Sequence, residues 1–162
     1  MEGAIVGIFR RRLSSLIVLA LVATPQCMAA EPKLPGYDAK ANPDVALIQA
    51  LAEAKAGNKK VLVVAGGEWC IWCHYLEAFL RKNPAIDADL HRAFVPLKVY
   101  IGDENKNTAF FSRLPKANGY PHFWVIAPEG KVLKSVNTAP LEDGGKSYDK
   151  KKFAKFIQDM AR

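Results

Sequence analysis

The stretch VLVVAGGEWCIWCHYL, residues 61–76, contains the features that decide the fold. It opens with four consecutive apolar residues at 61–64, three of them valine. Such a run predicts a strand that is buried on both faces. The double glycine at 66–67 ends the strand. The pattern that follows predicts a helix over residues 70–80, so the cysteines of this stretch lie where a strand gives way to a helix.

Cys70 and Cys73 are separated by two residues, a spacing at which two thiols can close a small disulfide ring. At the first turn of a helix, unpaired N–H groups and the helix dipole favour a thiolate over a thiol. Because only the thiolate attacks a disulfide, we expect a lowered pKa to make Cys70 the nucleophile and Cys73 the residue that resolves the mixed disulfide. The pair therefore predicts an enzyme that catalyses thiol–disulfide exchange, with this disulfide as its redox group and no other cofactor or metal.

The rest of the chain predicts alternating helices and strands. Asn42-Pro43-Asp44 begins a helix that Gly57 ends, and its apolar face is predicted to hold Val45, Ile48, Leu51 and Ala52. Further elements are predicted over 83–92 (helix), 94–101 (strand), 108–114 (helix), 123–126 and 132–136 (a hairpin), and in a last helix with Phe153, Phe156, Ile157 and Met160 on one face. This order predicts an α/β fold with a mixed central sheet and helices on both faces.

Residues 1–30 differ from the remainder of the chain. Three arginines at 10–12 precede an apolar run at 13–23, and small residues follow at 29–30. This order is typical of a secretory signal peptide, and the apolar run is shorter than the roughly 20 residues of a membrane-spanning helix. We therefore expect a signal peptide over 1–30, an N-terminal arm over 31–42, one domain over 43–162 and a periplasmic location. An uncleaved membrane anchor is the alternative.

Charge and cysteine count also limit the function. The chain has a formal net charge of +7, and residues 1–30 hold three of its 23 basic and one of its 16 acidic residues, so the remainder carries +5. No dense basic stripe with interleaved aromatic residues appears, so we expect no nucleic acid partner. Removal of residues 1–30 would also remove Cys27 and leave only the pair at 70 and 73.

Three other interpretations of the cysteine pair remain open at this point. Residues 70–74 also fit C-x-x-C-H, the pattern for covalent haem attachment, which would make this an electron-transfer protein. His74 would then be the proximal ligand, with a distal ligand among His91, His122 and Met160. A structural zinc site needs four ligands, and the chain has no second C-x-x-C. The pair can also be a structural disulfide in a binding module.

The segment at 61–76, with Trp69 immediately before the first cysteine, resembles the active-site segment of the thioredoxin-like superfamily. Gly119-Tyr120-Pro121, followed by the predicted strand at 123–126, is similar to the cis-proline loop of that superfamily. The resemblance covers residues 43–162. It implies a thioredoxin fold, an exported thiol–disulfide oxidoreductase and a cis Pro121 packed beside the disulfide.

The resemblance also implies how substrates and partners bind. The backbone around Tyr120 would pair with an extended substrate chain, so Tyr120 and Pro121 are predicted to bind substrate. Trp69 is expected to shield the sulfurs and contact substrate, and Trp72 is expected to be exposed and to do the same. The expected partners are cysteine-containing exported proteins and a membrane thiol–disulfide reductase or oxidase that recycles the dithiol. We expect the protein to be a monomer.

Two departures from thioredoxins bear on the chemistry. Ile71 and Trp72 stand between the cysteines in place of Gly-Pro, and Val64 stands where thioredoxins have a buried acid that assists proton transfer. Glu68 and Lys98 are the nearest substitutes, although both are interpreted first as surface charges. His74, when protonated, is a candidate for tuning the pKa of Cys70.

Overall fold

A four-stranded mixed sheet forms the centre of the computed structural model, which describes residues 36–162; the predicted signal peptide and Cys27 lie outside these residues. The strands are β1 (Lys60–Gly66), β2 (Phe94–Tyr100), β3 (His122–Ile126) and β4 (Val132–Asn137), in the order β2-β1-β3-β4. Strand β1 is parallel to β2 and antiparallel to β3, and β3 is antiparallel to β4. The predicted mixed sheet is therefore confirmed.

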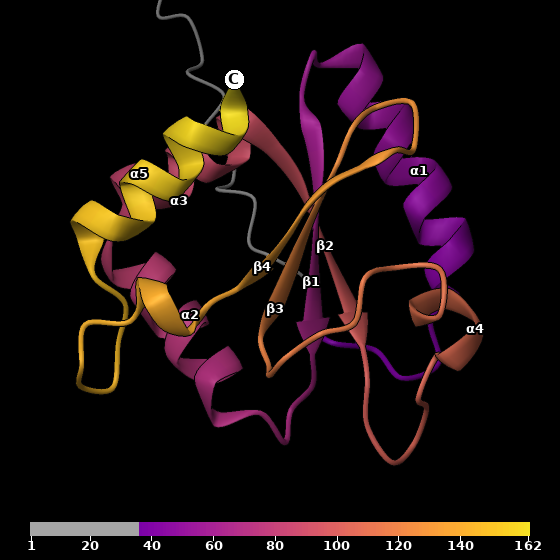
Figure 1. Cartoon of the computed structure of the whole chain (residues 1–162), viewed down its shortest axis with the longest axis horizontal. Helices are drawn as coiled ribbons and strands as arrows, with labels where there is room; N and C mark the ends of the chain where they lie inside the picture. The colour runs from indigo at the N-terminus through magenta and orange to yellow at the C-terminus, as the bar shows by residue number, and fades with distance from the viewer. Residues whose placement is uncertain (1–35) are drawn as a thin grey trace, which may run out of the picture. The chain divides into compact units, whose positions relative to one another are not determined.

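Helices cover both faces of this sheet (Figure 1). They are α1 (Pro43–Ala56), α2 (Ile71–Lys82), α3 (Pro84–Ala93), α4 (Thr108–Phe111) and α5 (Lys150–Ala161), with a short 3-10 turn at Ala139–Leu141. Helices α1 and α4 lie on one side of the sheet, and α2, α3 and α5 lie on the other. Within residues 36–162, no helix is both long enough and apolar enough to cross a membrane.

Strand β1 is buried on both faces, as its apolar run predicts. Leu62 and Val64 pack with side chains of α2 and α5, whereas Val61 and Val63 pack with side chains of α1. The last helix contributes three buried side chains, Phe153, Phe156 and Ile157, to the first of these two cores. Because neither face of β1 is exposed, only residues at its ends can contact a substrate. The segment after its carboxyl end contains the two cysteines.

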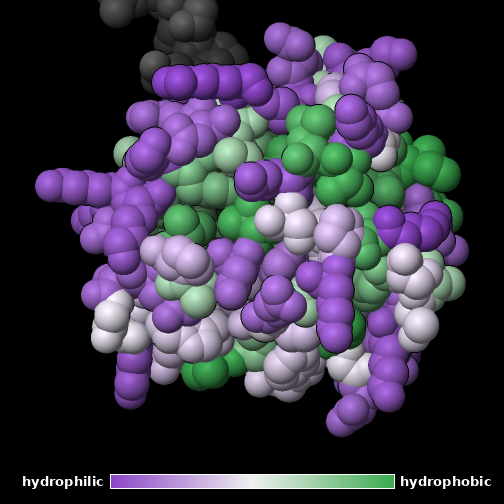
Figure 2. Space-filling view, in the orientation of Figure 1, coloured by the Kyte–Doolittle hydropathy of each residue, from purple (hydrophilic) through white to green (hydrophobic). Residues whose placement is uncertain are grey.

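The apolar face predicted for α1 is wrong in part, because Leu51 packs against the core but Val45 and Ile48 do not. Asn42 caps the helix as predicted, and its side chain accepts hydrogen bonds from two backbone N–H groups of the first turn. However, Ala50 and Ala54 are the residues buried against the sheet, while Val45 and Ile48 are 51% and 68% exposed. Two alanines let the helix backbone approach the sheet closely, with Leu47 and Leu51 partly buried beside them. Figure 2 shows hydrophobic residues reaching the surface on the side of α1.

Two further elements differ from the prediction in length. Helix α4 has four residues, shorter than the predicted span of 108–114. The stretch 137–146 was expected to be irregular, but it contains the 3-10 turn, and Glu142 forms an isolated bridge with Tyr148 just beyond it. Both are short elements whose geometry depends on the packing around them more than on local sequence.

Candidate active site

The dithiol lies at the junction predicted for it. Cys70 is the N-terminal cap of α2, and its Sγ accepts a hydrogen bond from the backbone N–H of Cys73, with a donor–acceptor distance of 3.2 Å. The two residues form a disulfide, with their Cα atoms 5.2 Å apart. An N–H group aimed at Sγ of Cys70 stabilises negative charge on that sulfur once the bond is reduced. This geometry suits Cys70 as the attacking sulfur.

Little of either cysteine reaches the surface in the oxidised form. Cys70 is 4% exposed and Cys73 is 2% exposed. The surface beside them is formed by two large apolar side chains, because Trp69 and Ile71 are each 56% exposed. A partner that approaches the disulfide therefore contacts these two side chains, Trp69 and Ile71, before it contacts a sulfur atom. We call the two residues the apolar collar.

The double glycine is required by close packing around the disulfide. A β-carbon on Gly66 would collide with Sγ of Cys73 and would lie 2.8 Å from the hydroxyl oxygen of Tyr37. A β-carbon on Gly67 would lie 2.6 Å from Nε1 of Trp69. The sequence suggested only that the glycines end a strand, whereas the structure shows that they also leave room for the redox site.

The predicted cis-proline loop is present at the same end of the sheet. The Tyr120–Pro121 peptide bond is cis, and Gly119 before it has a φ of 126°, a conformation that favours glycine. Because Ala65 pairs with His122, Pro121 lies just beyond the end of β1, where the dithiol loop begins. The side chain of Pro121 is buried, and its carbonyl accepts a hydrogen bond from Thr138. Tyr120 is only half-buried, and the substrate-binding role of Tyr120 and Pro121 stays a prediction.

Trp69 joins the dithiol loop to the cis-proline loop. Its ring packs edge-on against Tyr120, with the ring centroids 5.7 Å apart, and its Nε1 donates to the carbonyl of Ile101 over 2.6 Å. Open hollows of about 420 and 360 Å³ lie on its two sides. Ile101 and Phe111 line the larger one, and Asp38 lines the smaller. A tryptophan fixed in this way can contact a substrate on either side.

Trp72 and His74 differ from their expected surroundings. Trp72 is half-buried instead of exposed, because its ring packs edge-on against Tyr75 and Tyr148. His74 is exposed, and its Nε2 lies 2.7 Å from the carbonyl oxygen of Glu68. That contact gives His74 a role in holding the loop that precedes Cys70. The role of His74 in tuning the pKa of Cys70 stays a prediction.

The remaining histidines lie away from the sulfurs. Burial lowers the pKa of His122, and its ring packs at a tilt against Trp124 and contacts the hydroxyl of Ser135. His91 contacts the backbone carbonyl of Asp87 within α3. Among residues 36–162, no group of three or more acidic, histidine or cysteine side chains is placed to hold a metal ion. Haem attachment would require thioether bonds to two sulfurs that are here bonded to each other.

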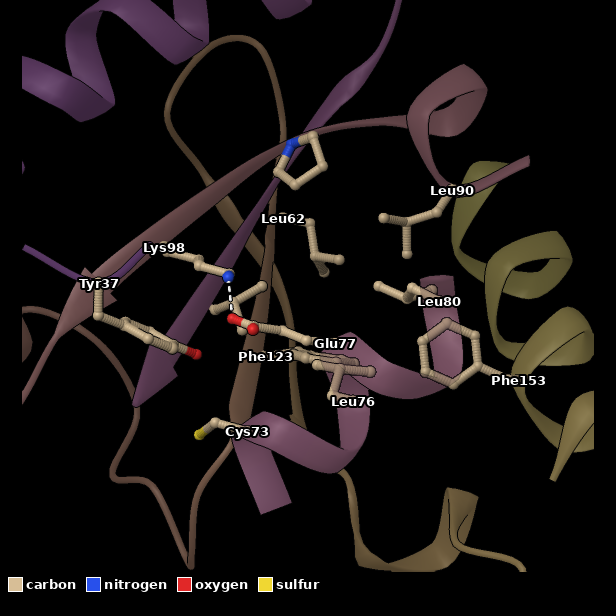
Figure 3. A pocket seen from close by; sticks show the side chains of 12 residues that line it. Tyr37, Leu62, Cys73, Leu76, Glu77, Leu80, Leu90, Lys98, Phe123 and Phe153 are labelled. Carbon is tan, nitrogen blue, oxygen red and sulfur yellow. Dashed lines mark hydrogen bonds and ion pairs between the residues drawn. The ribbon is translucent and has the colours of Figure 1, made fainter. Parts of the chain in front are cut away.

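A buried ion pair behind Cys73 is the feature that the sequence analysis missed. Lys98, interpreted from sequence as a surface charge, has a side chain only 4% exposed, and its Nζ donates to Oε1 of Glu77. Lys98 pairs in register with Val64, the position of the acid found in thioredoxins. Glu77 lies one helical turn after Cys73, so the i, i+4 spacing on α2 was the available signal. Both side chains line one small cavity with Cys73 (Figure 3).

This ion pair predicts unequal costs for removing its two members. Glu77→Gln leaves the ammonium of Lys98 buried without its partner, and we expect a loss of about 2 kcal/mol in the free energy of unfolding. Lys98→Met removes the buried charge, and Glu77, 35% exposed, can turn to water, so the loss should stay within about 1 kcal/mol. Denaturant unfolding of the oxidised proteins measures both values.

The exposed pair Lys155–Asp159 on α5 is the matched control for this comparison. Both of its side chains are exposed, at 74% and 39%, so Asp159→Asn should change the free energy of unfolding by less than about 0.5 kcal/mol. A larger loss for Lys98→Met than for Glu77→Gln would contradict the argument that desolvation of the lysine dominates.

Comparison with known proteins identifies the family of this fold and site. A family model described as thioredoxin-like matches residues 42–128. The structure of a disulphide isomerase from Xylella fastidiosa is 25% identical, with a TM-score of 0.63, and the match covers 78% of this chain and 96% of that one. The C-terminal domain of DsbD from Neisseria meningitidis, in its oxidised form, is 15% identical, with a TM-score of 0.54 and coverages of 74% and 96%. A search of curated protein sequences finds no match.

The chain belongs to the thioredoxin-like family. Its mixed sheet and its cis-proline loop agree with that family. The disulfide at the first turn of α2 adds the reactive group, so the protein is a thiol–disulfide oxidoreductase of this fold.

Proposed function

We propose that this protein exchanges disulfides with cysteine-containing exported proteins through the Cys70–Cys73 couple, in a bacterial periplasm. The observation that carries the proposal is the disulfide at the start of α2, beside the exposed apolar side chains of Trp69 and Ile71. The signal-peptide pattern of residues 1–30 supports export. Similarity to a solved disulphide isomerase supports a protein as the substrate.

The exchange follows from the geometry of the two sulfurs. In the reduced protein, the thiolate of Cys70 attacks one sulfur of a substrate disulfide, forms a mixed disulfide and releases the other substrate sulfur as a thiolate. The thiolate of Cys73 then attacks Sγ of Cys70, closes the intramolecular disulfide and releases the second substrate sulfur. The same steps in reverse transfer a disulfide to a substrate dithiol. The reduction potential of the couple sets the direction.

Substrate contact is assigned to the apolar collar of Trp69 and Ile71 and to Tyr120 beside it. Trp69 and Tyr120 present aromatic edges, and the backbone at Tyr120 can pair with an extended substrate chain. The exposed part of Trp72, between the two cysteines in sequence, is a further contact, and the buried cis Pro121 fixes the conformation of the loop. An unfolded or extended segment with apolar residues near its cysteine fits this surface best.

The disulfide is proposed as the redox group of the protein, with no other cofactor. A membrane thiol–disulfide reductase or oxidase would recycle it, and no nucleic acid takes part. We propose that the protein acts as a monomer, because each chain has both sulfurs and the collar around them.

Exchange with a peptide disulfide tests the proposal directly. The reduced protein without residues 1–30 is mixed with a fluorogenic peptide disulfide, and the reaction is compared with dithiothreitol at the same thiol concentration. We expect the protein to react faster, and we expect the same protein alkylated on both cysteines to be inactive. A rate no higher than that of dithiothreitol would refute the proposal. Equilibration with glutathione redox buffers then gives the reduction potential and the direction of exchange.

A further inference from the structure

The N-terminal arm brings a tyrosine to the buried side of the redox site. The described part of the arm is fixed at Ala39, whose carbonyl accepts a hydrogen bond of 2.9 Å from Nδ2 of Asn105. A second bond, from the backbone N–H of Lys40 to Asp38, closes a turn after Tyr37. The ring of Tyr37 packs against the core on the α2 side of the sheet. Tyr37 lies outside the residues that match the family model.

The hydroxyl group of Tyr37 lies beside the sulfur of Cys73. Both atoms would touch a β-carbon placed on Gly66, so they occupy the same small space above the end of β1. Figure 3 shows the hydroxyl end of Tyr37 directed toward the region between the Lys98–Glu77 pair and Cys73. Nζ of Lys98 lies 5.1 Å from the centre of the Tyr37 ring. The cavity that these four side chains line has a volume of about 10 Å³, close to the least that one water needs.

The sulfur of Cys73 needs a hydrogen-bond donor at this place. In the resolving step and its reverse it carries a negative charge, as the attacking thiolate in one direction and as the departing thiolate in the other. Its other neighbours in the cavity are mainly apolar, among them Val64, Leu76 and Phe123, and such surroundings disfavour a thiolate. Burial, together with the negative charge of Glu77, raises the pKa of Tyr37. Its phenol therefore keeps its proton and can donate a hydrogen bond.

We propose that Tyr37 donates a hydrogen bond to the thiolate of Cys73, and that Glu77 accepts the proton that this thiol loses. This inference rests on the proposed exchange function. In the resolving step, the proton of the Cys73 thiol passes to the carboxylate of Glu77, directly or through one water. The resulting thiolate attacks Sγ of Cys70, the Cys70–Cys73 bond forms, and the bond from Cys70 to the substrate breaks. The substrate sulfur leaves as a thiolate.

Charged and titratable groups from several elements surround this site and take part in its pH dependence. Glu77 comes from α2, Lys98 from β2, Glu68 from the dithiol loop and Tyr148 from the segment before α5. Lys98 neutralises Glu77 and also lies over the ring of Tyr37. Because a glutamate that is 35% exposed can pass a proton to solvent, the cluster connects a buried thiol to bulk water.

The ionisation of Cys73 tests this assignment without depending on activity. In a Cys70→Ser background, the thiolate absorbance of Cys73 is titrated with and without Tyr37→Phe, which keeps the ring and removes only the hydroxyl. We expect the midpoint to rise by about one pH unit, since a hydrogen bond to a charged group contributes on that order. Tyr75→Phe is the control, because Tyr75 of α2 packs against the same core but does not line this cavity. An unchanged midpoint in Tyr37→Phe would overturn the assignment.

A kinetic arm separates this inference from the proposed function. With both cysteines present, Tyr37→Phe and Glu77→Gln should each resolve a preformed mixed disulfide roughly 10-fold more slowly, with rate profiles moved to higher pH. The first attack by Cys70 should keep its wild-type rate. Wild-type exchange with no effect of Tyr37→Phe contradicts the inference alone, whereas absence of exchange in the wild type contradicts the proposed function. Thermal melts of the oxidised variants identify any that fail to fold.

Discussion

Cys73→Ser is expected to capture substrates covalently and then to hold them. Cys70 keeps its position at the start of α2, because the backbone N–H of residue 73 that donates to its Sγ is unchanged by the substitution. The mixed disulfide can then be broken only by an external thiol. An internal thiol at an effective concentration in the molar range exceeds a millimolar external thiol about 10³-fold, so resolution should slow by on the order of 10³-fold. Mass spectrometry of the trapped adduct and its decay rate measure the effect.

The reciprocal variant distinguishes the two sulfurs. Cys70→Ser should form no adduct above background with the same peptide disulfide, because Cys73 lies inside the first turn of α2 and its side chain faces the small internal cavity. If Cys73 captured substrate as fast as Cys70, the assignment of Cys70 as the attacking sulfur would be wrong. The two variants have the same amino-acid composition, so any difference in adduct formation is due to the position of the remaining cysteine.

The sequence allowed the fold around the dithiol to be predicted because its signals are local. A four-residue apolar run, a double glycine and a cysteine at a helix cap each act through neighbouring residues. Strand β1 and helix α2 accordingly agree with the prediction, and the cis bond at Pro121 agrees with what the resemblance to the thioredoxin-like superfamily implies. The order of the elements was then enough to indicate a mixed sheet covered on both faces.

The buried side of the site was not predictable because it depends on contacts between distant segments. Tyr37 comes from an arm that shows no periodicity, and nothing in residues 31–42 indicates that one side chain enters the core. Lys98 belongs to a strand in which a lysine usually points to solvent. Its partner Glu77 is recognisable only once α2 and β2 are placed side by side. The acid missing at Val64 was noticed and Lys98 was named as a possible substitute, but its burial and its pairing with Glu77 were not predicted.

Packing also determines which face of α1 is buried against the sheet. The spacing of Val45 and Ile48 suggested a buried stripe, yet the helix rests on the sheet through two alanines. A stripe of large residues and a stripe of small ones compete when a helix packs on a flat sheet, and closer approach favours the small residues here. Sequence periodicity alone does not indicate which of the two stripes is buried.

Phe153→Ala is expected to cause a large loss of stability and tests the core that supports α2. Phe153 is fully buried, and its ring contacts Phe79 of α2, Phe123 of β3 and two more aromatic rings, Tyr148 and Phe156. Removal of a buried phenyl group from such a cluster leaves a cavity and should lower the free energy of unfolding by about 4 kcal/mol. Denaturant unfolding of the oxidised protein gives the value.

Ile48→Ala is the matched control, and it also tests the face of α1. Its side chain is 68% exposed, and alanine has the higher helix propensity, so stability should change by less than about 0.5 kcal/mol. If the apolar stripe predicted from sequence were the buried one, this variant would lose about 2 kcal/mol or more. The losses in the free energy of unfolding of the two variants therefore show whether Phe153 of α5 is buried and whether Ile48 of α1 is exposed. A small loss for Phe153→Ala would mean that α5 does not hold α2 in place behind the dithiol.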